Sequence, residues 1–158
     1  MSVQSILKCL RGLLSTGALP APVQLRIVNL TRQSEVAWRG NKASDTATRR
    51  KGLLGRTGME PGEAMWIVPC EAIHTFGMKF AIDVVYLDRQ LRVVKTRCAV
   101  PRSRISACPR AHSVLELPAG TIALSKSQPG DQISIESICE PAIKCAAQGL
   151  FASLATPS

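Results

Sequence analysis

The stretch Phe80-Ala-Ile-Asp-Val-Val-Tyr-Leu87 decides the fold, because eight residues with a single acid among apolar side chains predict a buried β-strand. Side chains alternate across a strand, so Asp83 points to the same side as Val85 and Leu87. A carboxylate cannot be buried there unpaired without a large desolvation penalty. We therefore expect Asp83 to be held by donors from His74, Arg50, Arg56 or backbone N–H groups.

The segment before this strand carries three side chains that suit a soft metal ion. Cys70, His74 and Met78 are spaced four residues apart, and thiolate, imidazole and thioether groups are ligands for copper. Pro69 precedes them and Gly77 lies among them, which favours a loop over the helix that would align them. A metal site is therefore not favoured, and no cofactor is expected.

Short strand signals, separated by turn residues, recur along the rest of the chain. One helix is expected at residues 41–54, where Ser44 or Asp45 can cap its start and Gly55 can end it. The expected strands are 23–30, 35–38, 65–68, 80–87, 91–100, 113–117, 121–124 and 132–138. This pattern predicts a mainly β body with one principal α-helix, built as a compact β-sandwich, a jelly-roll-like body or an irregular barrel.

The 158 residues favour one folded domain between two terminal segments. Two prolines, Pro20 and Pro22, predict a linker, so we expect an N-terminal amphipathic segment and linker at 1–22, the domain at 23–140 and a tail at 141–158. Lys8 and Arg11 interrupt the apolar residues of the first segment, which is unlike a secretory signal. A cytoplasmic location is expected, with export or association with a membrane surface through this segment as alternatives.

The net charge of +9 is concentrated in particular segments. Residues 89–112 contain seven Lys or Arg and no acid, and such a field attracts nucleic acid, anionic lipid or acidic protein. Aromatic residues are only 4% of the chain, whereas single-strand binders stack bases on several rings, so nucleic acid is not the favoured partner. No apolar stretch approaches the ~18 residues of a membrane span.

The six cysteines show no Cys-x-x-Cys spacing, which argues against a zinc ribbon or a thioredoxin-like pair. We expect reduced thiols, with disulfides as the alternative if the protein is exported.

Catalytic candidates are few. Glu116 alternates with Leu115 and Leu117 and could form an acid pair with Asp83, assisted by His74. Arg50 and Arg56 could bind an anion. The chain has no Gly-x-Ser-x-Gly elbow, P-loop or His-Glu-x-x-His motif, so binding is favoured over catalysis.

Three segments of the chain form a recognisable set: Arg50-Lys-Gly-Leu-Leu-Gly-Arg56, the run from Ile73 to Asp88, and Val114-Leu-Glu-Leu-Pro-Ala-Gly120. Together they resemble the domain-of-unknown-function family 192, a group of bacterial and archaeal proteins. The resemblance covers about residues 25–138 and implies a jelly-roll-like or sandwich body with one helix near its start. It implies no established activity. Ala81 stands where relatives commonly have proline. The matching positions are Arg50, Gly52, Arg56, His74, Met78, Asp83, Glu116 and Gly120.

The sequence thus predicts a binding or accessory module with a polar pocket for a small ligand or a protein partner. The expected ligand-binding residues are Arg50, Arg56, His74, Met78, Asp83 and Glu116. Two alternatives remain: an acid–base hydrolase using Asp83, Glu116 and His74, and a non-specific binder of nucleic acid or anionic surfaces through residues 89–112.

Overall fold

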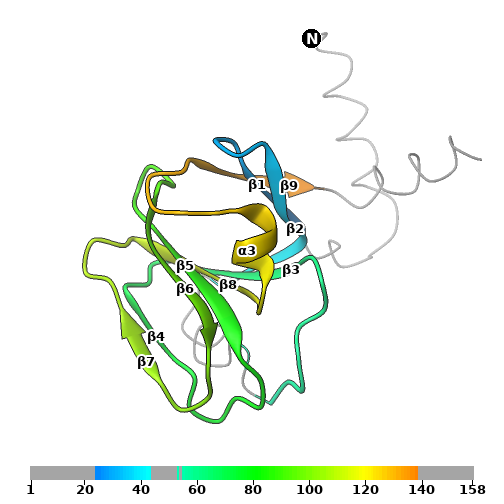
Figure 1. Ribbon diagram of the computed structural model, residues 1–158, viewed down its shortest axis with the longest axis vertical. Helices are drawn as coiled ribbons and strands as arrows, with labels where there is room; N and C mark the ends of the chain where they lie inside the picture. Colours follow the sequence, from blue (N-terminus) through cyan, green and yellow to red (C-terminus); the bar gives the residue numbers. More distant parts are fainter. Residues whose placement is uncertain (1–23, 44–52, 54, 139–158) are drawn as a thin grey trace, which may run out of the picture.

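The computed structural model describes residues 24–43, 53 and 55–138 (Figure 1). Within these residues the chain forms nine β-strands and one short helix. Their bounds are β1 (Gln24–Asn29), β2 (Ser34–Ala43), β3 (Glu63–Ile67), β4 (Ala72–His74), β5 (Ile82–Leu87), β6 (Val93–Val100), β7 (Ile105–Ala107), β8 (Ser113–Pro118), α3 (Thr121–Ser125) and β9 (Ile133–Ile138). The predicted terminal segments 1–22 and 141–158 lie outside the described residues.

Seven of these strands form one sheet in the order β6-β5-β8-β3-β2-β1-β9. Its neighbouring strands are antiparallel except β2 and β3, which run parallel. The edge strands approach each other through a bridge between Arg92 and Gln132, but the sheet is not closed into a barrel. Strands β4 and β7 form a separate antiparallel pair.

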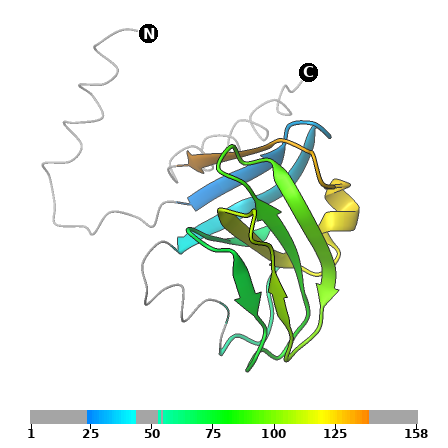
Figure 2. The same cartoon turned by 90° about the vertical axis from the view of Figure 1, so that its left-hand side faces the viewer.

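Apolar side chains pack against both faces of the large sheet. On one face, called the α3 face below, Val85 and Leu117 pack with Ile122 of α3. On the opposite face, called the β4–β7 face, Val84 packs in a second cluster with Ile73 of β4. Figures 1 and 2 show β4 and β7 together at the end of the molecule away from β9. This layering confirms the predicted β-sandwich-like fold.

The predicted strands agree with the structure in most places. The run 80–87 forms β5 from Ile82 onward, and the segments 23–30, 65–68, 91–100, 113–117 and 132–138 correspond to β1, β3, β6, β8 and β9. Strand β2 is longer than the predicted 35–38. Strands β4 and β7 were not predicted, because three residues are too few to show an alternating pattern.

The predicted strand at 121–124 is wrong, because these residues belong to α3. Gly120 adopts a φ of 95° and turns the chain directly after β8. The Asp83 carboxylate on β5 then accepts hydrogen bonds from the N–H groups of Gly120 and Ile122, at 3.0 and 2.8 Å. A strand distant in sequence therefore supplies the acceptor that the helix start needs, and local periodicity does not show it.

The predicted helix at 41–54 begins too early, because Asn41 and Ala43 pair with β3 as the end of β2. Residues 44–52 and 54 of that prediction lie outside the described residues. Across the described ranges, no helix combines the length and apolarity needed to cross a membrane.

Candidate functional site

The two buried acids singled out in the sequence lie next to each other in the sheet but on opposite faces. Asp83 of β5 pairs with Leu117 of β8, and the following pair is Val84 with Glu116. Directly paired residues point to the same side, and successive residues alternate. Asp83 therefore points to the α3 face and Glu116 to the β4–β7 face, so the two carboxylates share no cleft.

Asp83 is fully buried, and backbone donors surround its carboxylate. Oδ1 accepts the N–H of Ala99 at 2.7 Å, where β6 bulges opposite Asp83. Oδ2 accepts the N–H groups of Gly120 and Ile122. Of the donors expected from the sequence, backbone N–H groups are therefore the ones that the structure provides. The carboxylate joins β5, β6 and the start of α3.

Glu116 is 5% exposed and lies between Met65 of β3 and Val84 of β5 on the β4–β7 face. Its carboxylate has no hydrogen-bond or ion-pair partner in the part of the chain that the structure describes. Burial raises the pKa of Glu116 to about 7. The side chain therefore exchanges its proton near neutral pH and has spare hydrogen-bonding capacity.

An ion pair lies on the same face as Glu116. Glu63 precedes Met65 by two residues on β3, so it is diagonal to Glu116, and such diagonal neighbours are about 7–8 Å apart. Glu63 Oε2 accepts from Arg56 Nη2 at 2.6 Å and from the Glu60 N–H at 2.9 Å. Partial burial acts to raise the pKa of Glu63, but these hydrogen bonds outweigh it and hold the pKa below its usual value. The Arg56 guanidinium is thus engaged by Glu63.

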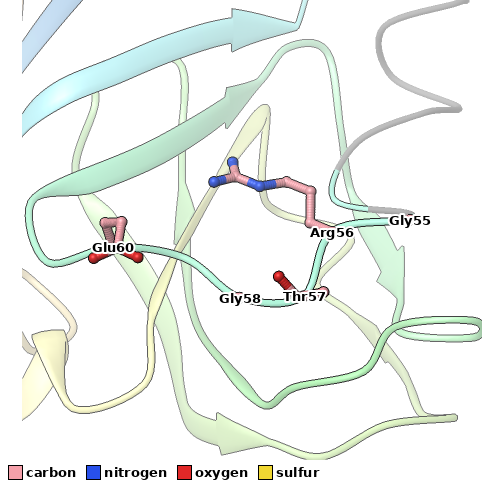
Figure 3. Close-up of a pocket in the computed structure, with 5 residues that line it drawn as sticks. All are labelled: Gly55, Arg56, Thr57, Gly58 and Glu60. Carbon is pink, nitrogen blue, oxygen red and sulfur yellow. The ribbon is translucent and has the colours of Figure 1, made fainter.

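The loop that carries Arg56 borders an open pocket of about 470 Å³. Figure 3 shows the Arg56 side chain extending from the loop, with Glu60 further along it. The lining residues are Gly55, Arg56, Thr57, Gly58 and Glu60. This loop leads directly into β3 and so to the strand beside Glu116.

The other predicted site residues do not gather around one point. His74 is exposed on β4, and its ring lies 5.7 Å from that of Phe76, whereas Met78 is buried in the core of the β4–β7 face. Asp83 lies across the large sheet from both. Cys70 Sγ contacts the Ala72 carbonyl. Residues 24–43, 53 and 55–138 contain no group of three His, Cys, Asp or Glu side chains that could hold a metal ion. Arg50 lies outside the described residues.

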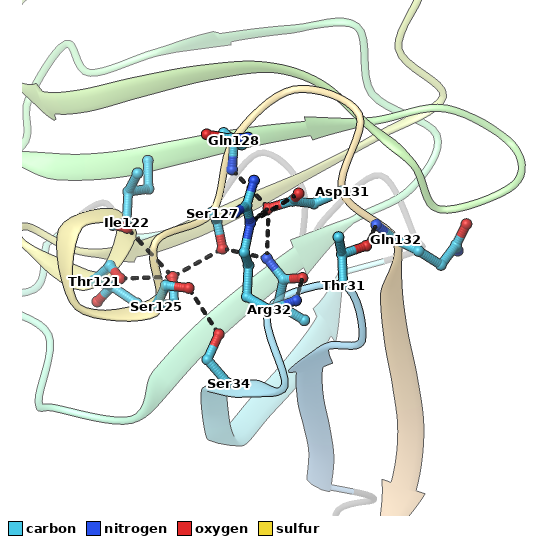
Figure 4. A network of polar contacts seen from close by, with 11 residues as sticks. Thr31, Arg32, Ser34, Thr121, Ile122, Ser125, Ser127, Gln128, Asp131 and Gln132 are labelled. Atoms are coloured by element: carbon cyan, nitrogen blue, oxygen red, sulfur yellow. Dashed lines mark hydrogen bonds and ion pairs between the residues drawn. The ribbon is translucent and has the colours of Figure 1, made fainter.

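A buried polar network at the other end of the sheet was not predicted from the sequence (Figure 4). Asp131 accepts hydrogen bonds from the side chains of Asn29 and Arg32 at 2.9 and 3.1 Å, and Ser127 also accepts from Asn29. The network ties the β1–β2 turn to the loop between α3 and β9. The turn signal Pro129-Gly130 was visible in the sequence, but the partners of Asp131 lie about a hundred positions away.

Comparison with known proteins identifies the family of this chain. Residues 28–135 match the model of the family DUF192, described as "Uncharacterized ACR". The chain belongs to the DUF192 family. Two of the family-like segments noted in the sequence meet in the structure, since Asp83 accepts the N–H of Gly120. In this DUF192 protein, those matching positions thus include a structural contact.

Two solved structures have a similar fold. One is a protein of unknown function from Novosphingobium aromaticivorans DSM 12444, with TM-score 0.63, 20% identity, and coverage of 75% of this chain and 94% of that one. The other is a candidate transcription regulator from Sinorhizobium meliloti 1021, with TM-score 0.62, 24% identity, and coverage of 77% and 98%. At these identities the likeness concerns the fold of the DUF192 protein alone. No curated protein matches the sequence.

Proposed function

We propose that this DUF192 protein is a binding module that holds a small amine-bearing ligand at Glu116 on the β4–β7 face. The observation that carries the proposal is a carboxylate that is nearly fully buried and without a partner in the described residues. A buried acid normally has a hydrogen-bond donor, and its desolvation is costly when it has none. A ligand that brings the donor would offset this cost.

The surroundings of Glu116 support an ammonium group rather than an anion. Arg56, the cation on the neighbouring loop, is already paired with Glu63. Glu60, which lines the open pocket of this loop, is an exposed acid. The acids of this loop and of β3 therefore favour a cationic ligand over an anion, and charge-assisted hydrogen bonds are among the strongest in proteins.

The acid–base alternative receives less support. A general acid and a general base must reach the same substrate, so they must share one cleft. Asp83 and Glu116 point to opposite faces, and Asp83 already accepts three backbone hydrogen bonds. His74 is exposed on β4 and contacts Phe76. Binding at a single carboxylate requires none of these groups to cooperate.

The test compares a cationic probe with a neutral probe of the same size. Thermal shift and calorimetry with n-butylammonium and n-butanol are measured on the full chain, on Glu116→Gln and on Glu71→Gln. Glu71 is an exposed acid beside β4 and serves as the matched control. We expect n-butylammonium alone to stabilise the wild type and Glu71→Gln, and Glu116→Gln to lose the response.

The pH dependence adds a second criterion. Because an ammonium group pairs with the ionised carboxylate, affinity should rise as pH increases through about 7, the pKa of Glu116. The proposal fails if Glu116→Gln responds like the wild type, or if the wild type does not distinguish the two probes.

A further inference from the structure

The outer surface of the β4–β7 pair exposes apolar side chains beside cations. His74 of β4 pairs directly with Ile105 of β7, so both point to the same side. Ile105 is 70% exposed and Phe76, next to the His74 ring, is 48% exposed. Three exposed cations lie on the adjoining turns. We call this set the tip surface: His74, Phe76, Lys79, Arg102, Arg104 and Ile105.

The tip surface is held in place by one buried residue, Thr75. Its hydroxyl donates to the Pro101 carbonyl at 2.7 Å and accepts from the Arg104 N–H at 2.9 Å. Its backbone N–H donates to the Arg104 carbonyl, and its carbonyl accepts from the N–H of Ser103. The turns that carry Phe76 and the two arginines are therefore fixed relative to each other, which lowers the entropy lost on binding.

The charge of the tip surface is uncompensated. Lys79, Arg102 and Arg104 make no ion pair with any carboxylate, as far as the described residues go. The segment 89–112 contains no acid at all. A second copy of this chain would meet the tip surface with the same positive charge, so self-association through it is disfavoured. The partner that fits is anionic.

The apolar side chains narrow the choice among anionic partners. A single-stranded nucleic acid is bound through several aromatic rings that stack on its bases. On the tip surface, the most exposed large apolar side chain is instead the aliphatic Ile105. A stable protein interface buries about 800 Å² on each partner, with an apolar core. Peripheral membrane proteins insert a few apolar side chains into the headgroup region of a bilayer, while neighbouring cations attract anionic lipids. The two large apolar side chains and the cations of the tip surface match this arrangement.

We propose that the tip surface docks on an anionic lipid bilayer. Phe76 and Ile105 enter the interface between headgroups and acyl chains, and Lys79, Arg102 and Arg104 meet the lipid phosphates and carboxylates. The β4–β7 pair lies at one end of the molecule, so it can reach a flat surface without hindrance from β9 (Figures 1 and 2). This inference does not depend on the ligand site at Glu116.

The test measures binding of the full chain to vesicles of phosphatidylcholine with phosphatidylserine, against vesicles of phosphatidylcholine alone. Each cation near an anionic bilayer strengthens binding by about fivefold, so Arg102→Gln/Arg104→Gln should weaken it by about 25-fold. The control Arg89→Gln/Arg92→Gln removes the same charge from exposed positions at the opposite end of β6 and should weaken it much less. Phe76→Ser/Ile105→Ser should weaken binding by about tenfold, and this loss should persist in high salt.

All substituted side chains are exposed, so the thermal midpoint of every variant should match that of the wild type. The proposal is overturned if both arginine variants weaken vesicle binding equally, because binding would then depend on the net charge of the protein and not on the tip surface. It is also overturned if the tip variants leave vesicle binding intact. A third contradicting result would be a wild type that does not bind vesicles but binds an oligonucleotide or an acidic peptide, with the tip variants abolishing that binding.

Discussion

Asp83 and Glu116 occupy successive pairs of the β5–β8 ladder, yet the two faces of the sheet provide them with different numbers of hydrogen-bond donors. On the α3 face, three backbone N–H groups converge on Asp83. On the β4–β7 face, Glu116 is almost as buried and has no donor among the described residues. The carboxylate of Asp83 therefore stabilises the fold, whereas burial of the ionised Glu116 carboxylate destabilises it.

This contrast shows that burial alone does not indicate what an acid does. The donors around Asp83 are backbone groups of a bulge and a helix start, which need an acceptor in the folded state. Around Glu116 the paired strand residues are apolar, and Arg56, the cation of the neighbouring loop, is bound to Glu63. The first arrangement is complete, and the second, as far as the described residues go, is open to a ligand or a proton.

Removing the Asp83 carboxylate should have the largest effect on stability. Asp83→Ala leaves three backbone donors without acceptors in the interior, and we expect the free energy of unfolding to fall by about 4 kcal/mol. Asp83→Asn keeps the size of the side chain and one acceptor oxygen, so about half of that loss is expected. Urea unfolding monitored by circular dichroism measures both. A loss below about 1 kcal/mol for Asp83→Ala would contradict the structural role.

Substituting Glu116 should have the opposite sign. The pKa of Glu116 in the folded protein is raised from 4.5 to about 7, so its ionisation destabilises the fold as pH rises through this range. Glu116→Gln should therefore be more stable than the wild type by about 3 kcal/mol at about pH 8, and by much less at about pH 5. Unfolding free energies of both proteins at the two pH values measure the difference. Equal stabilities at both would show that Glu116 is solvated.

The sequence was sufficient to predict that Asp83 is buried and requires donors, because the strand around it is apolar on both sides. It was insufficient for Glu116, since its environment depends on the register between β8, β5 and β3. That register pairs Glu116 with Val84 rather than with Asp83. A shift by one residue would have placed both acids on one face, and the residue pattern of β8 alone does not exclude it.

The same limit applies to the helix and the short strands. Thr121–Ser125 form a helix because a carboxylate from β5 accepts hydrogen bonds at its start, which is a tertiary contact. Strands β4 and β7 form because they pair with each other across 33 positions of chain, as the register of Ile73 with Ser106 shows. Longer strands such as β5 bury enough side chains for their pattern to be visible in the sequence.

Asp131 extends the comparison to a second acid with a full set of donors. Asp131 is 2% exposed, and its carboxylate accepts hydrogen bonds from Asn29, Arg32 and the Gln128 N–H. Burial acts to raise the pKa of Asp131, but these donors outweigh it and lower the pKa. Its contribution to stability should be present above the ordinary pKa and be lost as pH falls through the lowered one. Asp131→Ala should cost about 2 kcal/mol at neutral pH in urea unfolding. A stability unchanged by this substitution would mean that the network is incidental.

The smallest effect should come from Arg56, and it bears most directly on Glu116. Its ion pair with Glu63 is partly exposed, with 37% of the Arg56 side chain and 18% of the Glu63 side chain accessible, so Arg56→Gln should cost about 1 kcal/mol or less. Glu63 then keeps its charge at neutral pH without a cation, diagonal to Glu116, and like charge raises the pKa of a carboxyl group. Glu116→Gln should abolish the pH dependence of the unfolding free energy that arises from Glu116. The midpoint of this pH dependence should therefore move to higher pH in Arg56→Gln. Arg26→Gln removes a more exposed ion pair, the one with Glu35, and should leave that midpoint in place. If both arginine variants keep the wild-type midpoint, Glu63 and Glu116 do not interact, and the ligand site does not extend to the Arg56 loop.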